Sequence, residues 1–255
     1  MKVLLSPAKS IDSSGLSGNY PSSVPFFLKE AKQLVGKLKK MGAPALVQLM
    51  GISTDLAELN AMRYKNWKDP LEQSEEIVPA LLAFSGEVYR GLDARSLSEN
   101  ELLQANQKLR ILSGLYGILK PNDLMYPYRL EMGTKWMITP KVKNLYHFWG
   151  KKLSQHLNSE LSEGEEIVNL ASSEYFKAID LKVLKARVIT PVFKEFKNGE
   201  FKIVMMYAKH ARGAMARYIV QNNISDPEEL KLYNVDGYQF DVNSSTEDKW
   251  VFVRG

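Results

Sequence analysis

Cysteine is absent from the 255-residue chain. Its absence excludes disulfide bonds, thiolate metal ligands and a cysteine nucleophile. The ten methionines carry the only sulfur of the protein, and thioether sulfur oxidises by a milder, reversible route. This sulfur content suits a protein of the reducing cytoplasm.

Long apolar runs are absent too. No stretch approaches the roughly 20 apolar residues that a membrane-spanning helix needs. The N-terminus lacks the apolar segment and the small-residue cleavage site of a signal peptide. We therefore expect a cytoplasmic protein with no membrane partner.

Familiar catalytic motifs are also missing. The chain has no G-x-x-x-x-G-K-[ST], G-x-G-x-x-G or G-x-S-x-G pattern. Ser6 and Lys9 match the spacing of a lysine-activated serine, but the K-T-G partner is absent, so a turn after a strand is the better interpretation. The three histidines, His147, His156 and His210, lack metal-ligand spacing. We expect neither a metal nor a cofactor.

Positive charge is in modest excess. The chain carries 34 Lys and Arg residues against 29 Asp and Glu residues, a formal net charge of +5. The isoelectric point is near 9.1. A basic surface favours polyanionic partners, so nucleic acid becomes a candidate ligand.

The apolar periodicity predicts an α/β (mixed α+β) fold. Strands are expected at residues 2–5 and 109–112, and a strand breaking into a helix near 167–179. Asn198–Gly199 lies between two strand-like runs and predicts a hairpin turn. Helices are expected at the following segments: 24–42, 44–50, 54–65, 98–109 and 209–222. We expect a single domain over 1–255, with a mixed sheet, a helix-hairpin-helix-like element at 45–65 and C-terminal hairpins.

Polar residues cluster where predicted strands end. Ligands of α/β folds collect at the carboxyl ends of parallel strands, so these loops are expected to converge on one cleft. The residues after the strands are Lys9, Ser10, Ser113, Gly114, Ser172, Ser173 and Glu174.

Residues 110–133 form a long stretch without helical or strand rhythm, which we expect to line the cleft. Gly114 and Gly117 permit tight turns and close backbone approach to a ligand. Tyrosines at 116, 126 and 128 offer stacking faces, and Arg129 with Glu131 a charged donor and acceptor. The alternative is a structural loop whose tyrosines pack on the core beside a surface Arg–Glu pair.

A second constellation lies at residues 45–67. Apolar residues flank the turn Gly51-Ile52-Ser53, which is similar to a helix-hairpin-helix motif with serine in place of the usual second glycine. Such a turn exposes backbone amides to a DNA phosphate, and Arg63 and Lys65 extend the basic surface. A plain helix-turn-helix packing unit explains the apolar spacing equally well.

The segment "YAKHARGAMARYI" places basic residues on a predicted helix. Lys209 and Arg212 share a face, with Arg217 less squarely aligned. Beside a cleft, this face is a phosphate-contact surface. The alternative is ordinary solvated helix charge.

Eight segments distributed in order over the whole chain resemble the YaaA family of bacterial peroxide-stress proteins. They are "LLSPAKS", "LMGISTDLAELNAMRY", "LSGLYGILKPNDLMYPYRLEMG", "FWG", "NLASSEYF", "PVFKEFKNGEFKI", "YAKHARGAMARYI" and "GYQF". The resemblance implies a cytoplasmic oxidative-stress protein with an unusual mixed α/β fold, a positively charged cleft and DNA binding that includes a helix-hairpin-helix element. It brings no catalytic mechanism.

Carried over residue by residue, the matching segments contain Lys9, Ser113, Gly114, Tyr116, Gly117, Pro121, Asp123, Pro127, Tyr128, Arg129, Glu131, Asn169, Ser172, Glu174, Tyr175, Lys177, Lys209, Arg212 and Gly213.

Two functions follow from these patterns. In the first, the protein binds duplex or structured DNA, mainly through phosphate contacts of Gly51, Ile52, Ser53, Arg63, Lys65, Lys209 and Arg212. In the second, the cleft is an active site for a nucleotide-like ligand or a flipped base, with Glu131 or Glu174 as general acid or base. The cleft residues are Lys9, Ser113, Gly114, Tyr116, Gly117, Tyr128, Arg129, Glu131, Ser172, Glu174 and Lys177.

Overall fold

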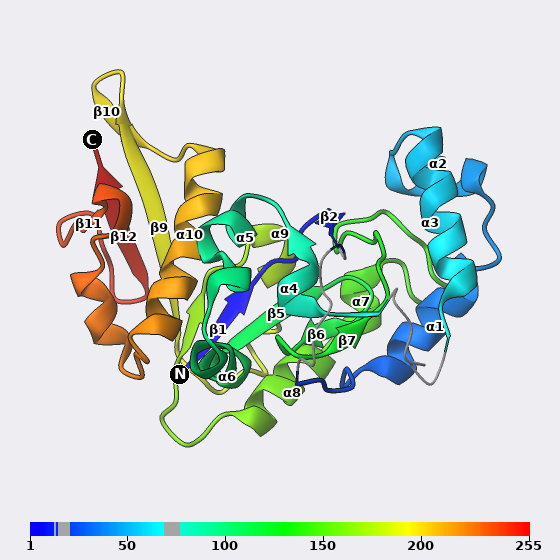
Figure 1. Ribbon diagram of the computed structural model, residues 1–255, viewed down its shortest axis with the longest axis horizontal. Coiled ribbons are helices and arrows are strands. Elements are labelled where there is room, and N and C mark those ends of the chain that lie inside the picture. Colours follow the sequence, from blue (N-terminus) through cyan, green and yellow to red (C-terminus); the bar gives the residue numbers. More distant parts are fainter. Residues whose placement is uncertain (13, 15–20, 69–76) are drawn as a thin grey trace.

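A mixed sheet runs through the middle of the protein (Figure 1). The computed structural model describes residues 1–12, 14, 21–68 and 77–255. Neighbouring strands β12, β9, β8, β1 and β5 run parallel, whereas the edge strands β6, β11 and β10 pair antiparallel. The mixed α/β fold expected from the sequence is therefore confirmed.

The strand order places β1 in the interior of this sheet, between β8 and β5. Val3, Leu4 and Leu5 of β1 are completely buried, because a parallel strand is covered on both faces. The strands are β1 Lys2–Leu5, β5 Leu109–Ser113, β6 Gly117–Leu119, β8 Ile167–Asn169, β9 Val188–Lys197, β10 Glu200–Lys202, β11 Gln239–Phe240 and β12 Lys249–Arg254. Two small antiparallel ribbons add β2 Ser10–Ile11 with β4 Phe84–Ser85, and β3 Val78–Pro79 with β7 Leu124–Met125.

Helices flank the sheet and form the outer parts of the molecule. They are α1 Leu28–Leu38, α2 Ala43–Met50, α3 Thr54–Asn66, α4 Ala80–Ala83, α5 Glu87–Leu92, α6 Glu99–Lys108, α7 Leu145–Trp149, α8 Lys152–Glu160, α9 Ser173–Phe176 and α10 Met205–Gln221, with short 3₁₀ turns at Ala94–Ser96, Pro227–Leu232 and Val235–Gly237. The predicted helices 44–50 and 54–65 correspond to α2 and α3, and the C-terminal hairpins to β9–β10 and β11–β12.

Two lobes rise on either side of the central strands. Helices α1, α2 and α3 form one, which we call the helical lobe, at the right of Figure 1. Strands β9 to β12 and helix α10 form the other, which we call the C-terminal lobe, at the left. The carboxyl end of β1 points toward the space between them.

Helices α5 and α10 cross at very short range. A Cβ atom added at Gly213 would lie 1.7 Å from the carbonyl oxygen of Val88, and one added at Gly91 would lie 2.1 Å from that of His210. Only glycine fits at both positions, because any side chain would overlap backbone atoms of the facing helix. This contact fixes α10 beside the carboxyl ends of the central strands.

Candidate functional site

A cavity of about 440 Å³ lies at the carboxyl ends of β1 and β8. We call it the strand-end cavity. The loop after β1, the start of α5, the β8–α9 connection and one face of α10 line it, together with Glu131. This is the edge of a parallel sheet at which α/β proteins bind their ligands.

Helix α10 supplies a basic wall. Met205, Lys209 and Arg212 all line the cavity because their spacing of four and three residues places them on one helix face. The side chains of Lys209 and Arg212 form no hydrogen bond or ion pair with any residue that the structure describes. Burial alone lowers the pKa of Arg212, which is half-buried. The wall therefore carries uncompensated positive charge.

The facing wall carries carboxylates with defined partners. Lys9 Nζ lies 2.8 Å from Glu131 Oε2, and Arg129 Nη2 donates to Glu131 Oε1 at 3.2 Å. Glu174 Oε1 accepts a hydrogen bond from the backbone N–H of Gly133 at 2.9 Å. Oε2 of Glu174 accepts none from the described residues. One end of the cavity therefore attracts anions, and the other offers a carboxylate oxygen as hydrogen-bond acceptor.

Hydrogen bonds between the strand ends hold the cavity floor. Ser6 Oγ accepts from the backbone N–H of Ser172 at 2.8 Å, and the Tyr89 hydroxyl donates to the Ser6 carbonyl at 3.0 Å. Burial raises the pKa of Tyr89 and of Tyr175 above the ordinary value, so both hydroxyls stay neutral. The floor is thus tied to β1, β8 and α5 without adding charge.

The structure brings together residues that the sequence assigned to two separate sites. Lys9, Ser172 and Glu174 were expected in a cleft, and Lys209 and Arg212 on a DNA-binding helix; Glu131, from the cleft group, joins them around the same cavity. Sequence reasoning missed several lining residues, among them Ser6, Glu87, Tyr89 and Met205. For Ser6, its place directly after β1 was the available signal.

Other residues predicted for the cleft lie in the core. Tyr116 is fully buried, where its hydroxyl accepts from Trp67 Nε1 at 2.9 Å and from the Tyr126 backbone N–H at 3.1 Å. Tyr128 is also buried, with its hydroxyl 2.5 Å from Ser113 Oγ. The expectation that these two tyrosines and Ser113 line the cleft is corrected: their polar atoms satisfy one another inside the protein.

Gly114 and Gly117 also serve packing. A Cβ atom on Gly114 would lie 2.2 Å from the Leu130 carbonyl oxygen. Gly117 has φ +71°, and a Cβ there would lie 2.7 Å from the Trp149 ring. Neither residue lines the strand-end cavity, so the close approach predicted at these glycines is made by protein atoms and not by a ligand.

Lys177 and Arg129 stand outside the cavity. Lys177 is exposed and lies 5.2 Å above the Tyr146 ring. Arg129 forms an ion pair with Glu131, and the Nε of Arg129 is buried without a hydrogen-bond partner among the described residues. Its carbonyl accepts a hydrogen bond from the hydroxyl of Tyr64, which ties residues 110–133 to α3.

Helices α2 and α3 pack on each other across the turn Gly51–Ser53. Gly51 ends α2 in the left-handed conformation at φ +62°, and Ser53 Oγ caps α3 by accepting from the Leu56 N–H at 3.4 Å. Ile52 is buried between them. This is the helix pair expected from the sequence.

Charge is unevenly distributed over this pair. Asp55 and Glu58, in the first turns of α3, are exposed. Near the other end, Lys65 is exposed, and Arg63 is half-buried with a pKa lowered by burial. The Arg63 side chain has no hydrogen bond or ion pair within the described part of the chain. The basic end of α3 is therefore the better anion-binding end.

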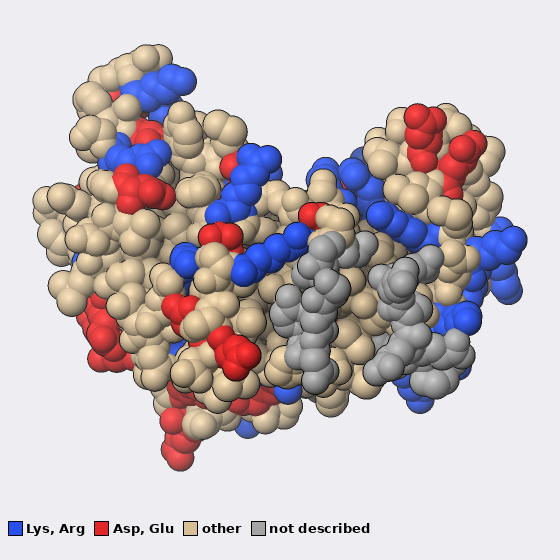
Figure 2. Space-filling model, in the orientation of Figure 1, with Lys and Arg blue, Asp and Glu red and all other residues tan. Residues whose placement is uncertain are grey.

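Figure 2 shows the surface hollowed between the helical lobe and the C-terminal lobe. Lys and Arg side chains gather along this hollow, whereas acidic side chains stand at the far end of the α2–α3 pair. We call this concave surface the basic hollow. Its floor lies on the side toward which the carboxyl end of β1 points, which is also the side of the strand-end cavity.

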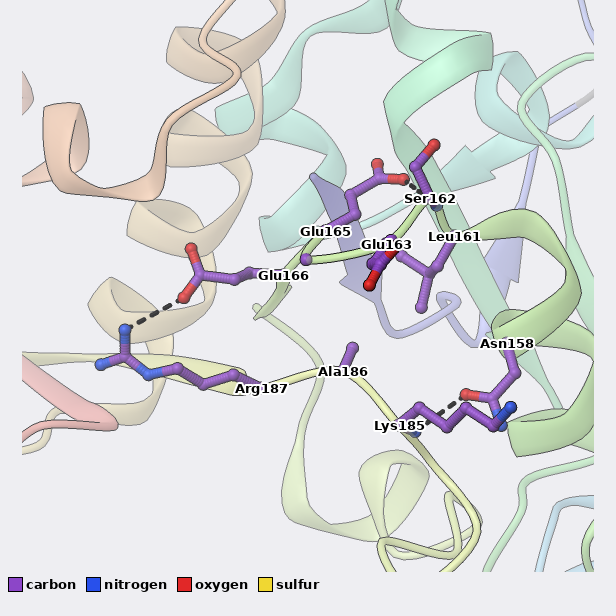
Figure 3. Close-up of a pocket in the computed structure, with 10 residues that line it drawn as sticks. Asn158, Leu161, Ser162, Glu163, Glu165, Glu166, Lys185, Ala186 and Arg187 are labelled. Atoms are coloured by element: carbon purple, nitrogen blue, oxygen red, sulfur yellow. Dashed lines mark hydrogen bonds and ion pairs between the residues drawn. The ribbon is translucent and has the colours of Figure 1, made fainter.

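A larger cavity of about 570 Å³ lies at the opposite edge of the sheet, before β8 and β9 (Figure 3). Three of the charged side chains that line it are ion-paired: Arg187 Nη1 lies 3.0 Å from Glu166 Oε1, and Glu165 Oε1 lies 2.9 Å from the N-terminal amine. Asn158 Oδ1 accepts the Lys185 N–H at 2.9 Å. Only the exposed Glu163 and Lys185, whose charges are of opposite sign, line this cavity without an ion pair among the described residues.

Comparison with known proteins gives the family. The family model described as peroxide stress protein YaaA matches residues 1–244. The chain belongs to the YaaA family of peroxide stress proteins. It is 47% identical to a UPF0246 protein of Ralstonia pickettii over 256 aligned positions, which cover 100% of this chain and 99% of that relative. A UPF0246 protein of Aliivibrio fischeri is 48% identical, with 100% and 98% covered. One of Flavobacterium psychrophilum is 48% identical, with 100% of both covered.

Family membership places the chain among proteins of the peroxide stress response. Within the described residues, no group of three or more His, Asp or Glu side chains has an arrangement that holds a metal ion. No described helix is long and apolar enough to cross a bilayer.

Proposed function

We propose that this YaaA-family protein acts in the cytoplasm as a DNA-binding protein of the peroxide stress response, and that it holds duplex or structured DNA through phosphate contacts in the basic hollow. The observation that carries the proposal is a pair of half-buried arginines without carboxylate partners among the described residues, Arg63 on α3 and Arg212 on α10.

Such arginines are costly unless an anion binds them. A guanidinium that loses water without gaining a counter-ion destabilises the folded state, and the lowered pKa values of Arg63 and Arg212 reflect that loss. A phosphate accepts two parallel N–H bonds from one guanidinium, which restores the lost interactions. Exposed Lys65 and Lys209 lie two and three residues away on the same helices and extend both contact surfaces.

The helix pair α2–α3 supplies a second kind of contact. Backbone N–H groups that follow Gly51, at Ile52 and Ser53, are placed to donate to a phosphate as in a helix-hairpin-helix element. Exposed Asp55 and Glu58 repel phosphates nearby, so we assign the larger share of affinity to the arginines and lysines. Contacts of both kinds reach phosphates and not base edges, and the proposal therefore predicts weak sequence preference.

Fluorescence anisotropy with labelled duplexes of unrelated sequence tests this proposal. We expect binding to all duplexes with similar affinity, weakening steeply as salt rises from 50 to 200 mM, as counterion release requires at about 0.9 log units of slope per phosphate contact. Absence of binding at 50 mM salt by folded protein would contradict the proposal.

Variants of the α2–α3 pair separate the contribution of the Arg63 charge from that of the backbone N–H groups after Gly51. Arg63→Ala should weaken binding and lower the salt slope by about one unit. Gly51→Val should distort the turn, because Gly51 has φ +62°, and should weaken binding with little change of slope. Lys185→Ala, at an exposed lysine of the larger cavity on the opposite edge of the sheet, is the matched control. Equal affinity of wild type and the double variant Gly51→Val, Arg63→Ala would remove the helix pair from the interface.

Catalysis by Glu131 or Glu174 stays a prediction. Both oxygens of Glu131 are already engaged in ion pairs, with Lys9 and Arg129, an arrangement that favours a positioning role over proton transfer. Oε2 of Glu174 is the more available of the two carboxylates for proton transfer. Incubation with free nucleotides and damaged duplexes, analysed for any product, tests this alternative.

A further inference from the structure

The strand-end cavity has two chemically different ends. Lys209 and Arg212 stand on α10 without counter-ions among the described residues. On the opposite side, Glu131 is held by Lys9, and Glu174 keeps one oxygen without a hydrogen-bond donor from the described chain. A ligand that satisfies both ends needs an anionic group at one end and N–H donors at the other.

The wall between these ends is apolar and aromatic. Tyr89, Leu170, Tyr175 and Met205 contribute to it. Aromatic and thioether side chains favour a flat, apolar ring over a hydrated sugar or a flexible peptide. The cavity volume of about 440 Å³ falls in the range of small-molecule sites, about 300–1,000 Å³, and is far too small for a duplex.

We propose that the strand-end cavity binds one nucleoside monophosphate unit, with its phosphate on Arg212 and Lys209 and the amino edge of its base on Glu174. The ring of the base lies among Tyr89, Tyr175 and Met205. A carboxylate accepts hydrogen bonds and cannot donate them, so the site selects bases that carry an exocyclic amino group. The unit is either a free nucleotide or a nucleotide turned out of a DNA strand.

This binding site shares Arg212 and Lys209 with the proposed phosphate contacts of the basic hollow, whereas Tyr89, Tyr175 and Glu174 belong to the cavity alone. Duplex binding rests on many charges spread over two lobes, whereas the proposed site rests on a cavity at one edge of the sheet. Binding of a free nucleotide needs no DNA. The failure of one proposal is therefore distinguishable from the failure of the other, because dCMP binding and duplex binding are measured separately. A strand-borne nucleotide would reach the cavity only if the DNA-binding proposal holds.

Calorimetric titration with two nucleotides of equal ring size provides the main test. Cytosine presents an amino group where thymine presents a carbonyl oxygen. We expect dCMP to bind the full-length protein about tenfold more tightly than dTMP, the discrimination of one good polar contact to a base. Deoxycytidine, which lacks the phosphate, should bind at least about tenfold more weakly than dCMP.

Two substitutions test which end of the strand-end cavity binds the base and which binds the phosphate. Glu174→Gln keeps an oxygen for the Gly133 N–H but adds an amide donor, so it should abolish the preference for dCMP over dTMP while leaving duplex binding unchanged. Arg212→Gln should weaken both nucleotides equally, by about tenfold. Lys177→Gln, which alters an exposed lysine outside the cavity, should change neither.

A duplex with one unpaired cytidine distinguishes the two sources of the ligand. A fully paired duplex competes with dCMP only for Arg212 and Lys209. Displacement of bound dCMP at clearly lower concentrations of the duplex with the unpaired cytidine than of the fully paired duplex identifies a strand-borne nucleotide, whereas equal displacement by both, or displacement by neither, identifies the free nucleotide. Failure of folded wild type to bind dCMP, equal affinity for dCMP and deoxycytidine, or equal affinity for dCMP and dTMP would overturn the proposal. Duplex binding that persists in that case leaves the DNA-binding function intact.

Discussion

The two edges of the central sheet differ in the ion pairing of their arginines. At the amino edge, Arg187 pairs with Glu166 and Asp248, and Arg110 with Glu160. At the carboxyl edge, Arg212 has no partner among the described residues, although it is half-buried. Both edges have cavities, and the larger one is at the amino edge.

This difference indicates that charge, and not cavity size, distinguishes a structural edge from a binding edge. Ion pairs at the amino edge join α8 to β5 and the residue before β8 to the residue before β9. Lys209 and Arg212, the two α10 cations that line the strand-end cavity, form no ion pair among the described residues, so the cost of burying Arg212 is offset only when an anion binds. The comparison predicts that substitutions at the two edges affect different properties.

The largest expected effect is on stability at the amino edge. Glu160→Ala removes the carboxylate that lies 2.6 Å from the buried Arg110 and 3.2 Å from Lys120. An uncompensated buried guanidinium remains, and we expect a loss of about 3–5 kcal/mol in the free energy of unfolding, measured by urea denaturation. The exposed Glu163→Ala serves as control and should change it by less than about 0.5 kcal/mol. Similar small losses for both variants would show that the amino-edge pairs do not hold the fold.

We expect a smaller loss of stability, together with weaker DNA binding, from a substitution where α10 crosses α5. Gly213→Ala places a methyl group 1.7 Å from the Val88 carbonyl oxygen and forces α10 away from α5. We expect destabilisation of at least about 1–3 kcal/mol and weakened DNA binding, because α10 carries the basic wall of the cavity. Gly36→Ala, on α1 with no atom near the added Cβ, is the matched control. DNA binding unaffected in folded Gly213→Ala would separate α10 from the interface.

The smallest expected effect is a pH dependence from His156, which stacks on Phe26 at 4.1 Å. Burial lowers its pKa below the ordinary value of 6.5, although Glu160 opposes this and Arg110 and Lys120 reinforce it. The unfolded chain therefore binds the proton more readily than the folded one. The contribution of neutral His156 to the free energy of unfolding is therefore complete above about pH 6.5. It is lost as the pH falls from there toward the lowered pKa. His156→Leu should flatten this part of the stability curve, and an unchanged slope would show that His156 does not titrate there.

The sequence predicted the positions of strands and helices better than it predicted which residues face a ligand. The alternation of strand, polar loop and helix located β1, β8 and the loops after them, because local periodicity and turn residues determine such steps. The sequence pattern could not show that Tyr116 and Tyr128 are core residues. A tyrosine that packs in the core and one that lines a cleft give the same local sequence pattern. The structural alternative that was considered for these tyrosines is the one that holds.

The composition of the cavity was predictable only in part. Lys9 and Ser172 follow their strands directly, and strand-end loops converge in any parallel sheet. Tyr89 and Met205 enter through the crossing of α5 and α10, which depends on two glycines more than 120 positions apart in the chain, Gly91 and Gly213. No local pattern reveals such a contact. The absence of counter-ions around Arg212 likewise depends on all surrounding elements.

Salt-dependent DNA binding by two arginine variants tests the central claim most directly. Arg212→Gln removes an unpaired guanidinium at the carboxyl edge, and Arg187→Gln removes a paired one at the amino edge. In anisotropy titrations between 50 and 200 mM salt, the account predicts that Arg212→Gln lowers the log–log slope by about 0.9, while Arg187→Gln leaves the slope of the wild type unchanged. A wild-type slope for Arg212→Gln, or an equal reduction for both variants, would contradict the assignment of the carboxyl edge as the binding edge.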